Sequence, residues 1–569
     1  MAAIRANRAD GQLTLLVSGH MFPIYLYYDP QGAWVPLPDE PTLSTQRVLG
    51  YNVANDLNAK LRGKTDVWLL LWQDEFVDPA GFVTTILDSQ AQRLAQNQSF
   101  WGVRLMHYRV PPGTVFSDQP QIQQPLNVNY GGEIALLGYN LPATASPADA
   151  GLNITLYWRA LKDLHEDYSV SLRVRDSDGR LVGKLDARPV AYEYPTTRWR
   201  AGDVLFGKFQ IPLELGAPPS NYRLEVIVYS SDSVEGLDIL DAGGKRAGKV
   251  AVLQPVPIER PTVQPAVDKL QMKRPLRFDF GNGIEMLGMD VQQVNPEPGE
   301  PIEISIYWRA RSVPSSDFRL VFELRRGADQ AAPLFGADDV FPVVRGLPTT
   351  RWKAGDIFRA QYTYYVPNDM PAGTRTLRMA MIRELFNPPA TSFVALGDVQ
   401  IQPSTRLFRA PAVQTPDSAQ YGDSIRNSVQ LFGHDLSPAP LALPGPTALR
   451  GITVQPGGKI VLTLYWQPLL RTRTAYNVFV HVHPLSQPTT LVAQRDSAPV
   501  GGKRPTTTWI PGEFIADSYE ITFGGDVPLG DYVVSVGLYD PVSGQRLPMT
   551  TLGQTGTSFT LRNFRVLVR

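Results

Sequence analysis

The chain has 569 residues, and its 54 Lys plus Arg balance its 54 Asp plus Glu, so the formal net charge is zero. A balanced charge offers no electrostatic footprint for nucleic acid or for an anionic membrane surface. The absence of Cys excludes disulfides, thiolate metal ligands and Cys nucleophiles, and the 50 Pro and 47 Gly favour a β-rich chain with many turns.

The sequence predicts a soluble chain without a membrane span. The first ten residues lack the apolar core of a signal peptide. Apolar runs such as residues 67–72 are far shorter than the ~20 residues that cross a bilayer.

The first 118 residues alternate between predicted strands and helices. Apolar runs predict buried strands at 13–17, 67–72 and 100–110. Apolar residues at every fourth position predict a helix over 44–62, and Asp78-Pro79 predicts a capping acid and a first-turn proline for a second helix. Residues 1–118 are therefore predicted to form a small α/β domain, a Rossmann-like half with a largely parallel sheet.

Ligands of open parallel sheets bind beyond the carboxyl ends of the strands. At those ends the sequence places four polar candidates for ligand binding: Ser18, His20, Asp74 and Glu75. They supply acids and a base, although solvated loop residues are the plainer interpretation of Asp74 and Glu75. No Gly-rich phosphate fingerprint is present, so no nucleotide cofactor is expected.

After a predicted linker at 115–130, one phrase occurs three times. Pro-Thr-Thr-Arg-Trp and its near copies stand at 195–203, 348–356 and 505–513. Each copy follows a strand that alternates apolar and polar residues and ends in Tyr-Trp, as in an antiparallel sheet with one buried face. The repeats predict three all-β Ig-like sandwich domains, at 131–260, 275–408 and 425–569.

The repeated aromatic residues suggest two different roles. Trp158, Trp308 and Trp466 share the apolar face of their strands and are predicted to be core residues. Their neighbours face the other way and are the better candidates for contacting a glycan at the surface: Tyr157, Tyr307 and Tyr465. The Pro-Thr-Thr-Arg-Trp phrase itself is predicted to be a structural corner, with Thr hydroxyls bonded to local backbone and the Arg paired with the acid after Gly.

His481 and His483 alternate on one predicted strand and share a face. Two such ligands can hold a metal, but no third ligand is evident nearby, so a satisfied or exposed pair is favoured and no metal is expected. Residues 176–179, Asp-Ser-Asp-Gly, lack the length of a calcium loop and predict a hairpin turn.

Residues 15–23, 66–75 and 100–103 resemble the extracytoplasmic C-terminal region of family 39, protein-mannosyltransferase-like bacterial membrane glycosyltransferases. The Leu-Tyr-Trp-Arg-Ala and Pro-Thr-Thr-Arg-Trp phrases resemble sandwich modules appended to some of those proteins. The resemblance implies a location outside the cytoplasm and a membrane glycosyltransferase or glycans as partners. Such enzymes carry their catalytic acid in a loop beside membrane helices that this sequence lacks, so no catalytic residue is carried over.

Three functional hypotheses remain. The first is a non-catalytic, extracytoplasmic module array associated with a membrane glycosyltransferase, which it supports or positions, or in contact with glycans. The second is a free-standing cell-surface adhesion or structural protein. The third is an enzyme that uses the strand ends of the α/β domain.

Overall fold

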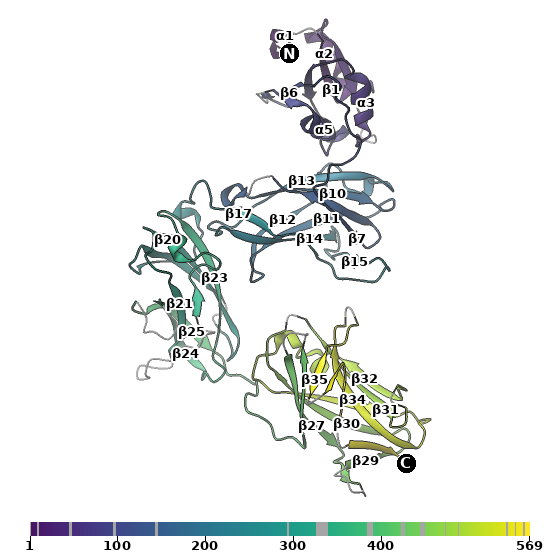
Figure 1. Ribbon diagram of the computed structural model, residues 1–569, viewed down its shortest axis with the longest axis vertical. Helices are drawn as coiled ribbons and strands as arrows, with labels where there is room; N and C mark the ends of the chain where they lie inside the picture. Colours follow the sequence, from purple (N-terminus) through teal and green to yellow (C-terminus); the bar gives the residue numbers. More distant parts are fainter. Residues whose placement is uncertain are drawn as a thin grey trace. The chain divides into compact units, whose positions relative to one another are not determined.

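The computed structural model consists mainly of β-sheets (Figure 1). It divides into two compact units, residues 1–271 with 355–359 and residues 272–354 with 360–569. It describes residues 2–7, 11–44, 48–94, 98–142, 146–292, 295–325, 340–383, 391–422, 427–443, 450–472, 474–487, 489–541, 544–551, 554–561 and 564–569.

The N-terminal part of the first unit is built on a mixed sheet in the order β2-β1-β3-β6-β4, with β5 paired to β6. The strands are β1 (Gln12–Val17), β2 (Trp34–Leu37), β3 (Asp66–Leu71), β4 (Gln92–Arg93), β5 (Gln98–Phe100) and β6 (Val103–Arg109). β1 is parallel to β2 and to β3, whereas β6 is antiparallel to β3, β4 and β5.

The predicted largely parallel sheet is therefore wrong for the half that contains β6. The predicted strand over 100–110 is interrupted, because Phe100 pairs with Val103 across a two-residue turn. Gly102 in this turn has φ 69°, a left-handed conformation that favours Gly. The β5–β6 hairpin therefore sends β6 back antiparallel, without the crossover helix that a parallel strand needs.

Helices lie on both faces of this sheet. Leu16, Trp68 and Leu70 pack with Met21 and Tyr25 on one face. The opposite face packs against α3 (Val53–Lys60) and α5 (Phe82–Gln90). The short helices are α1 (Ala2–Ala6), α2 (Phe22–Tyr28) and α4 (Asp74–Val77).

The predicted helix over 44–62 is shorter in the structure, since α3 covers only Val53–Lys60, and residues 45–47 lie outside the described ranges. The Leu49 amide instead donates a hydrogen bond to the Val77 carbonyl, at 2.7 Å. This bond fixes the chain before α3 in a non-helical path.

Asp78 caps α5 as predicted. Its carboxylate accepts hydrogen bonds from the amides of Phe82 (2.6 Å) and Val83 (3.0 Å). Pro79 precedes the helix and is not in its first turn, because α5 begins at Phe82. Burial raises the pKa of Asp78 to about 7, although the two amide bonds favour the charged carboxylate.

Three pairs of sheets follow, and we call them the first sandwich (124–259), the second sandwich (274–401) and the third sandwich (415–568). The first pairs β13-β10-β8-β7-β15 with β12-β11-β14-β17-β9, and β16 joins β14. Its strands are β7 (Gln124–Tyr130), β8 (Ile134–Asn140), β9 (Ser146–Pro147), β10 (Leu152–Ala160), β11 (Tyr168–Arg175), β12 (Leu181–Ala187), β13 (Val204–Ile211), β14 (Ser220–Ser230), β15 (Ile239–Leu240), β16 (Ala251–Val252) and β17 (Val256–Glu259).

The second sandwich pairs β18-β19-β20-β23 with β22-β21-β24-β25. Its strands are β18 (Arg274–Asp279), β19 (Ile284–Gln292), β20 (Pro301–Ala310), β21 (Arg319–Leu324), β22 (Val340–Pro342), β23 (Ile357–Tyr365), β24 (Gly373–Ile382) and β25 (Val394–Ile401).

The third sandwich pairs β33-β30-β27-β26-β35-β36 with β28-β29-β38-β34-β31-β32, and β37 joins β34. Its strands are β26 (Thr415–Gly422), β27 (Asn427–Ser437), β28 (Leu441–Ala442), β29 (Arg450–Val454), β30 (Lys459–Pro468), β31 (Asn477–Pro484), β32 (Ala493–Ser497), β33 (Ile515–Thr522), β34 (Gly530–Tyr539), β35 (Met549–Thr551), β36 (Gln554–Gly556), β37 (Phe559–Thr560) and β38 (Phe564–Val568).

Two predicted boundaries change. β7 pairs with β8, so the predicted linker at 115–130 is part of the first sandwich from Gln124 onward. β26 pairs with β27, so the third sandwich begins at Thr415 and not at 425. In both cases an entry strand with little apolar periodicity is held by its ladder bonds.

The repeated phrase forms the same corner three times. Its residues make a one-turn 3₁₀ helix at Thr196–Arg198, Thr349–Arg351 and Thr506–Thr508. In each corner the first Thr is buried. Its hydroxyl donates to a backbone carbonyl, that of Glu166 (2.7 Å), Ser316 (2.9 Å) or Thr474 (2.8 Å).

The same hydroxyl also accepts a hydrogen bond from the amide of Tyr168 (2.8 Å), Phe318 (3.0 Å) or Tyr476 (2.9 Å). We call this pair of bonds the threonine clamp. It joins each corner to the segment that starts β11, β21 or β31. The Thr hydroxyl bonds to backbone as predicted, but its partner lies 30–33 residues earlier in the chain and not in the local backbone of the turn.

All six repeated tryptophans are buried core residues, as predicted for the strand tryptophans. They are Trp158, Trp199, Trp308, Trp352, Trp466 and Trp509.

Candidate functional site

The first candidate site is the carboxyl edge of the parallel strands in the N-terminal part. Val17 pairs in register with Leu37 and with Leu71, so the three strands end together. The buried Ser18 donates a hydrogen bond to the Gln73 carbonyl at 3.1 Å, and Asp74 pairs with Arg104. The edge therefore brings the predicted residues near one another, but it already gives Ser18 and Asp74 partners.

His20 lies half-buried and stacks on Trp72, with ring centroids 5.5 Å apart. Within the described residues, no hydrogen bond joins His20 to Ser18, Asp74 or Glu75. Burial raises the pKa of Asp74, and the Arg104 guanidinium opposes that rise. Glu75 is exposed, and no hydrogen bond from it to this group is found among the described residues. The arrangement contains acidic side chains and a histidine, but among these described residues no nucleophile is hydrogen-bonded to a base.

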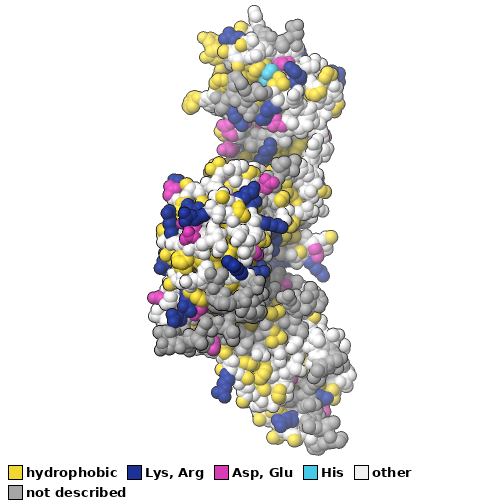
Figure 2. All heavy atoms as spheres, turned by 60° about the vertical axis from the view of Figure 1, so that its left-hand side comes forward, with side chains coloured by type: hydrophobic (Ala, Val, Ile, Leu, Met, Phe, Trp, Pro, Cys, Tyr) yellow, Lys and Arg dark blue, Asp and Glu magenta, His cyan; other side chains and the backbone are white. Residues whose placement is uncertain are grey.

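The hairpin beside this edge exposes two aromatic side chains. Trp101 is fully exposed at the β5–β6 turn, and Phe100 is about half exposed. β6 lies next to β3 in the sheet, with Arg104 opposite Leu71, so this turn extends from the edge that carries Asp74. Figure 2 shows hydrophobic side chains on the surface of the N-terminal part, at the top of the view. We call Phe100 and Trp101 the hairpin tip.

The second candidate set consists of the three strand tyrosines, whose side chains contact other residues of the protein. Tyr157 and Tyr307 are only 6% and 4% exposed, so their predicted surface position is wrong. Tyr465 is half-buried. The ring of Tyr157 lies 6.2 Å from that of Phe206, which also contacts the N-terminal part. The outer face of the sheet is thus covered at this position, which strand alternation could not reveal.

The hydroxyls of these tyrosines bond to the neighbouring strand. Tyr157 accepts from Asn140 (2.9 Å), Tyr307 donates to Asp290 (3.4 Å) and Tyr465 donates to Asp435 (2.9 Å). Each of these partners also accepts from an amide of the entry segment, that of Gln123 (2.7 Å), Lys273 (2.6 Å) or Gln414 (2.6 Å). The tyrosines therefore help to hold the entry strand in each sandwich.

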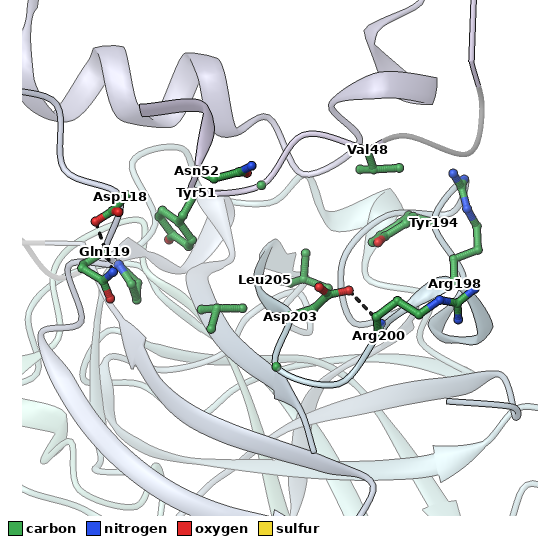
Figure 3. Close-up of a pocket in the computed structure, with 14 residues that line it drawn as sticks. Val48, Tyr51, Asn52, Asp118, Gln119, Tyr194, Arg198, Arg200, Asp203 and Leu205 are labelled. Atoms are coloured by element: carbon green, nitrogen blue, oxygen red, sulfur yellow. Dashed lines mark hydrogen bonds between the residues drawn. The ribbon is translucent and has the colours of Figure 1, made fainter. Parts of the chain in front are cut away.

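The third candidate was not predicted, and it is a cleft of about 970 Å³ in the first unit. Its volume is within the usual range for ligand sites, about 300–1,000 Å³. Val48, Tyr51 and Asn52 line it from the N-terminal part, and Asp118 and Gln119 line it from the connecting segment. In Figure 3 they lie opposite the corner of the first sandwich, from which Tyr194, Arg198, Arg200, Asp203 and Leu205 contribute.

The cations of the cleft fold back onto their own corner. Arg198 lies 5.0 Å from the Tyr194 ring centre and donates to the Glu193 carbonyl at 3.2 Å. Arg200 reaches the Trp199 carbonyl at 3.4 Å. Asp203 accepts a hydrogen bond from the Arg200 amide at 2.7 Å, and within the described ranges no Lys or Arg side chain pairs with it. The Asp203 carboxylate thus faces the cleft.

The cleft was missed because neither of its walls is a motif for binding. The repeated phrase predicts only the corner, and the opposite wall comes from residues 48–52 and 118–120, which lie far earlier in the chain. The two walls meet through Tyr51, Phe82 and Phe206, whose ring centres lie 4.8–6.0 Å apart. Lys208 also donates to Thr85 across this contact, at 2.8 Å.

The histidine pair of the third sandwich has protein partners. His481 lies 3.2 Å from Asp496, and His483 contacts the Ser535 hydroxyl (3.0 Å) and the Thr490 carbonyl (3.1 Å). Burial lowers the pKa of His481. Over the part of the chain that the structure describes, no group of three or more His, Asp and Glu could hold a metal ion. The Asp176 carboxylate closes the predicted hairpin turn by accepting from the Asp178 and Arg180 amides.

Among the described helices, none has both the length and the apolar character needed to cross a membrane.

Comparison with known proteins gives no family. No family model matches the chain, and no curated protein matches it. Among solved structures, a protein from Corynebacterium diphtheriae described as membrane anchored is 11% identical over 76% of this chain and 91% of its own, with a TM-score of 0.14. Red sea bream transglutaminase is 8% identical over 50% of this chain and 32% of its own, also with a TM-score of 0.14. At such TM-scores neither likeness bears on function.

Proposed function

We propose that this chain is a non-catalytic module array that acts outside the cytoplasm, where it positions a membrane glycosyltransferase or contacts glycans at the cell surface. In this proposal the N-terminal part is a truncated doubly wound α/β domain of Rossmann type. The three sandwiches are Ig-like modules that set its distance from other surfaces.

The observation that carries the proposal is the use of the repeated residues. In all three sandwiches the clamp threonines and the tryptophans are buried, and the strand tyrosines bond to the neighbouring strand. The side chains of these residues make their contacts inside the protein, and they stabilise three copies of one scaffold. A scaffold repeated in this way supports a positioning role better than a repeated binding role.

The hairpin tip supplies the contact with the partner. Exposed Trp and Phe side chains are favoured at the centres of protein interfaces, because they bury a large apolar area at low conformational cost. Phe100 and Trp101 lie at the end of a hairpin whose backbone is held by the pairing of Phe100 with Val103, so strand pairing lowers the conformational cost of docking.

The first test is whether the reading frame adjacent to its gene encodes a membrane glycosyltransferase. The second is co-purification of the full chain with that enzyme, in detergent, by size-exclusion chromatography. We expect the two to co-elute and Trp101→Ala to weaken the complex about 30-fold, which corresponds to about 2 kcal/mol for an interface hot spot. Tyr192→Ala, which removes an exposed aromatic ring from the first sandwich, is the matched control and should leave the complex unchanged. If the unaltered chain elutes alone, the association with a glycosyltransferase is wrong.

A further inference from the structure

The corner acid has different surroundings in the three sandwiches. It is Asp203 in the first, Asp356 in the second and Glu513 in the third, always directly after the Gly of the repeated phrase. In the third sandwich, Glu513 pairs with Arg406 from the preceding segment at 3.1 Å, and its side chain is 1% exposed. Asp356 belongs to the first unit. It pairs with Arg260 at 3.2 Å, and its side chain is 4% exposed. Each of these acids therefore holds an arginine from an extended segment.

The same two segments also accept a hydrogen bond from the backbone amide of the residue that follows the acid. The Phe514 amide donates to the Leu407 carbonyl at 2.7 Å, one residue after Arg406. The Ile357 amide donates to the Gln264 side chain at 2.9 Å. An arginine for the acid and an oxygen acceptor for the next amide thus form one binding pattern, seen twice in this chain.

In the first sandwich, the described residues supply neither an arginine for the acid nor an acceptor for the amide that follows it. The Ala160 amide of β10 donates to the Asp203 carbonyl at 3.0 Å. Residues of an antiparallel pair point alternately toward and away from the partner strand, so the amide of the next residue, Val204, points away from β10. β13 is the edge strand of its sheet, and no acceptor for the Val204 amide is found among the residues that the structure describes. Asp203 lines the cleft (Figure 3), and so does Val204.

Nearby cations do not argue against an incoming arginine. Arg198 and Arg200 flank Asp203, but Arg351 and Lys353 hold the corresponding positions beside Asp356. Asp356 nevertheless accepts Arg260. In the cleft the two arginines are engaged by Tyr194 and by backbone carbonyls.

We propose that the cleft of the first sandwich is a docking site for an extended, arginine-containing peptide segment of a partner protein. The guanidinium pairs with Asp203, and a carbonyl of the following residue accepts a hydrogen bond from the Val204 amide. The segment thereby repeats in trans what the segments around Arg260 and Arg406 do within the chain.

The chain itself provides the probe. A fluorescent peptide with the sequence of residues 403–409, Pro-Ser-Thr-Arg-Leu-Phe-Arg, is titrated with the full-length protein, and its anisotropy is measured. The copy within the chain stays on the third sandwich because its tether gives it a high effective concentration. We expect saturable binding that Asp203→Asn weakens at least about ten-fold, as for a lost hydrogen bond to a charged group. The Asn side chain keeps the acceptor for the Arg200 amide.

Two controls define the contact. Asp118→Asn removes the other carboxylate of the cleft and should leave the affinity unchanged. A peptide carrying Arg406→Ala should lose the binding that Asp203 provides. Absence of saturable binding, or equal binding by the Asp203→Asn protein, would overturn the proposal. Peptide-dependent self-association without an effect of Asp203→Asn would overturn it as well.

Discussion

The corners of the first and third sandwiches share a sequence phrase and a fold, but their acids have different surroundings. Glu513 is enclosed by Arg406 and Arg504, at 3.1 and 2.7 Å, and accepts from the Ile510 amide. Asp203 keeps the equivalent amide bond, from Arg200, and otherwise faces a cleft. A repeated phrase therefore specifies its own turn. The segment that precedes the sandwich, together with the residue directly before the phrase, decides whether the acid is a buried ion-pair partner or an open acceptor.

The largest expected effect is the difference in stability loss between substituting Glu513 and substituting Asp203. Glu513→Gln leaves two guanidinium groups without their carboxylate in a largely buried position, so we expect the third sandwich to lose about 3 kcal/mol of stability. Asp203→Asn should change the stability of the first sandwich by less than about 0.5 kcal/mol. Hydrogen exchange of peptides from β33 and β13, measured by mass spectrometry on the full chain, reports each sandwich separately. Equal effects in the two sandwiches would remove the distinction between the corners.

The threonine clamps should behave alike in both sandwiches, because their partners come from the same positions of each repeat. Thr196→Val and Thr506→Val each leave a buried amide and a buried carbonyl without a partner, at a cost of about 2 kcal/mol. The exposed second threonines provide the matched controls, and Thr197→Val and Thr507→Val should cost almost nothing. The measurement is the exchange rate of the β11 and β31 amides. A clamp that matters in only one sandwich would show that the corners are not equivalent.

The smallest effect concerns the strand tyrosines. Tyr157→Phe removes the hydroxyl that accepts from Asn140 inside the protein, and we expect a loss of about 1 kcal/mol. Tyr465→Phe should cost less, because this side chain is half-buried and water can replace the bond to Asp435. Glycan-array binding by the Tyr157→Phe protein should equal that of the unaltered chain. A change in glycan binding with no change in the exchange of β8 and β10 amides would restore the tyrosine to a recognition role.

The sequence by itself determined the features that depend on local periodicity and on repetition. Strict alternation placed the strand tryptophans in the core, and the repeated phrase located three corners. The phrase also indicated that the Thr hydroxyls bond to backbone, but not that their partners lie 30–33 residues earlier. Asp78 was correctly identified as a cap because a capping acid needs only the few amides that follow it.

The tertiary structure alone decided the features that depend on contacts between distant segments. The direction of β6 follows from the Trp101-Gly102 turn and its strand pairing, which no apolar pattern encodes. The burial of Tyr157 depends on Phe206 and on the N-terminal part that packs against it. The cleft at Asp203 exists because residues 48–52 and 118–120 lie across from the corner, whereas the preceding segment of the third sandwich covers the same position with Arg406. A single phrase can thus predict a turn, but the charge environment of its last residue is set by whichever segment packs beside it.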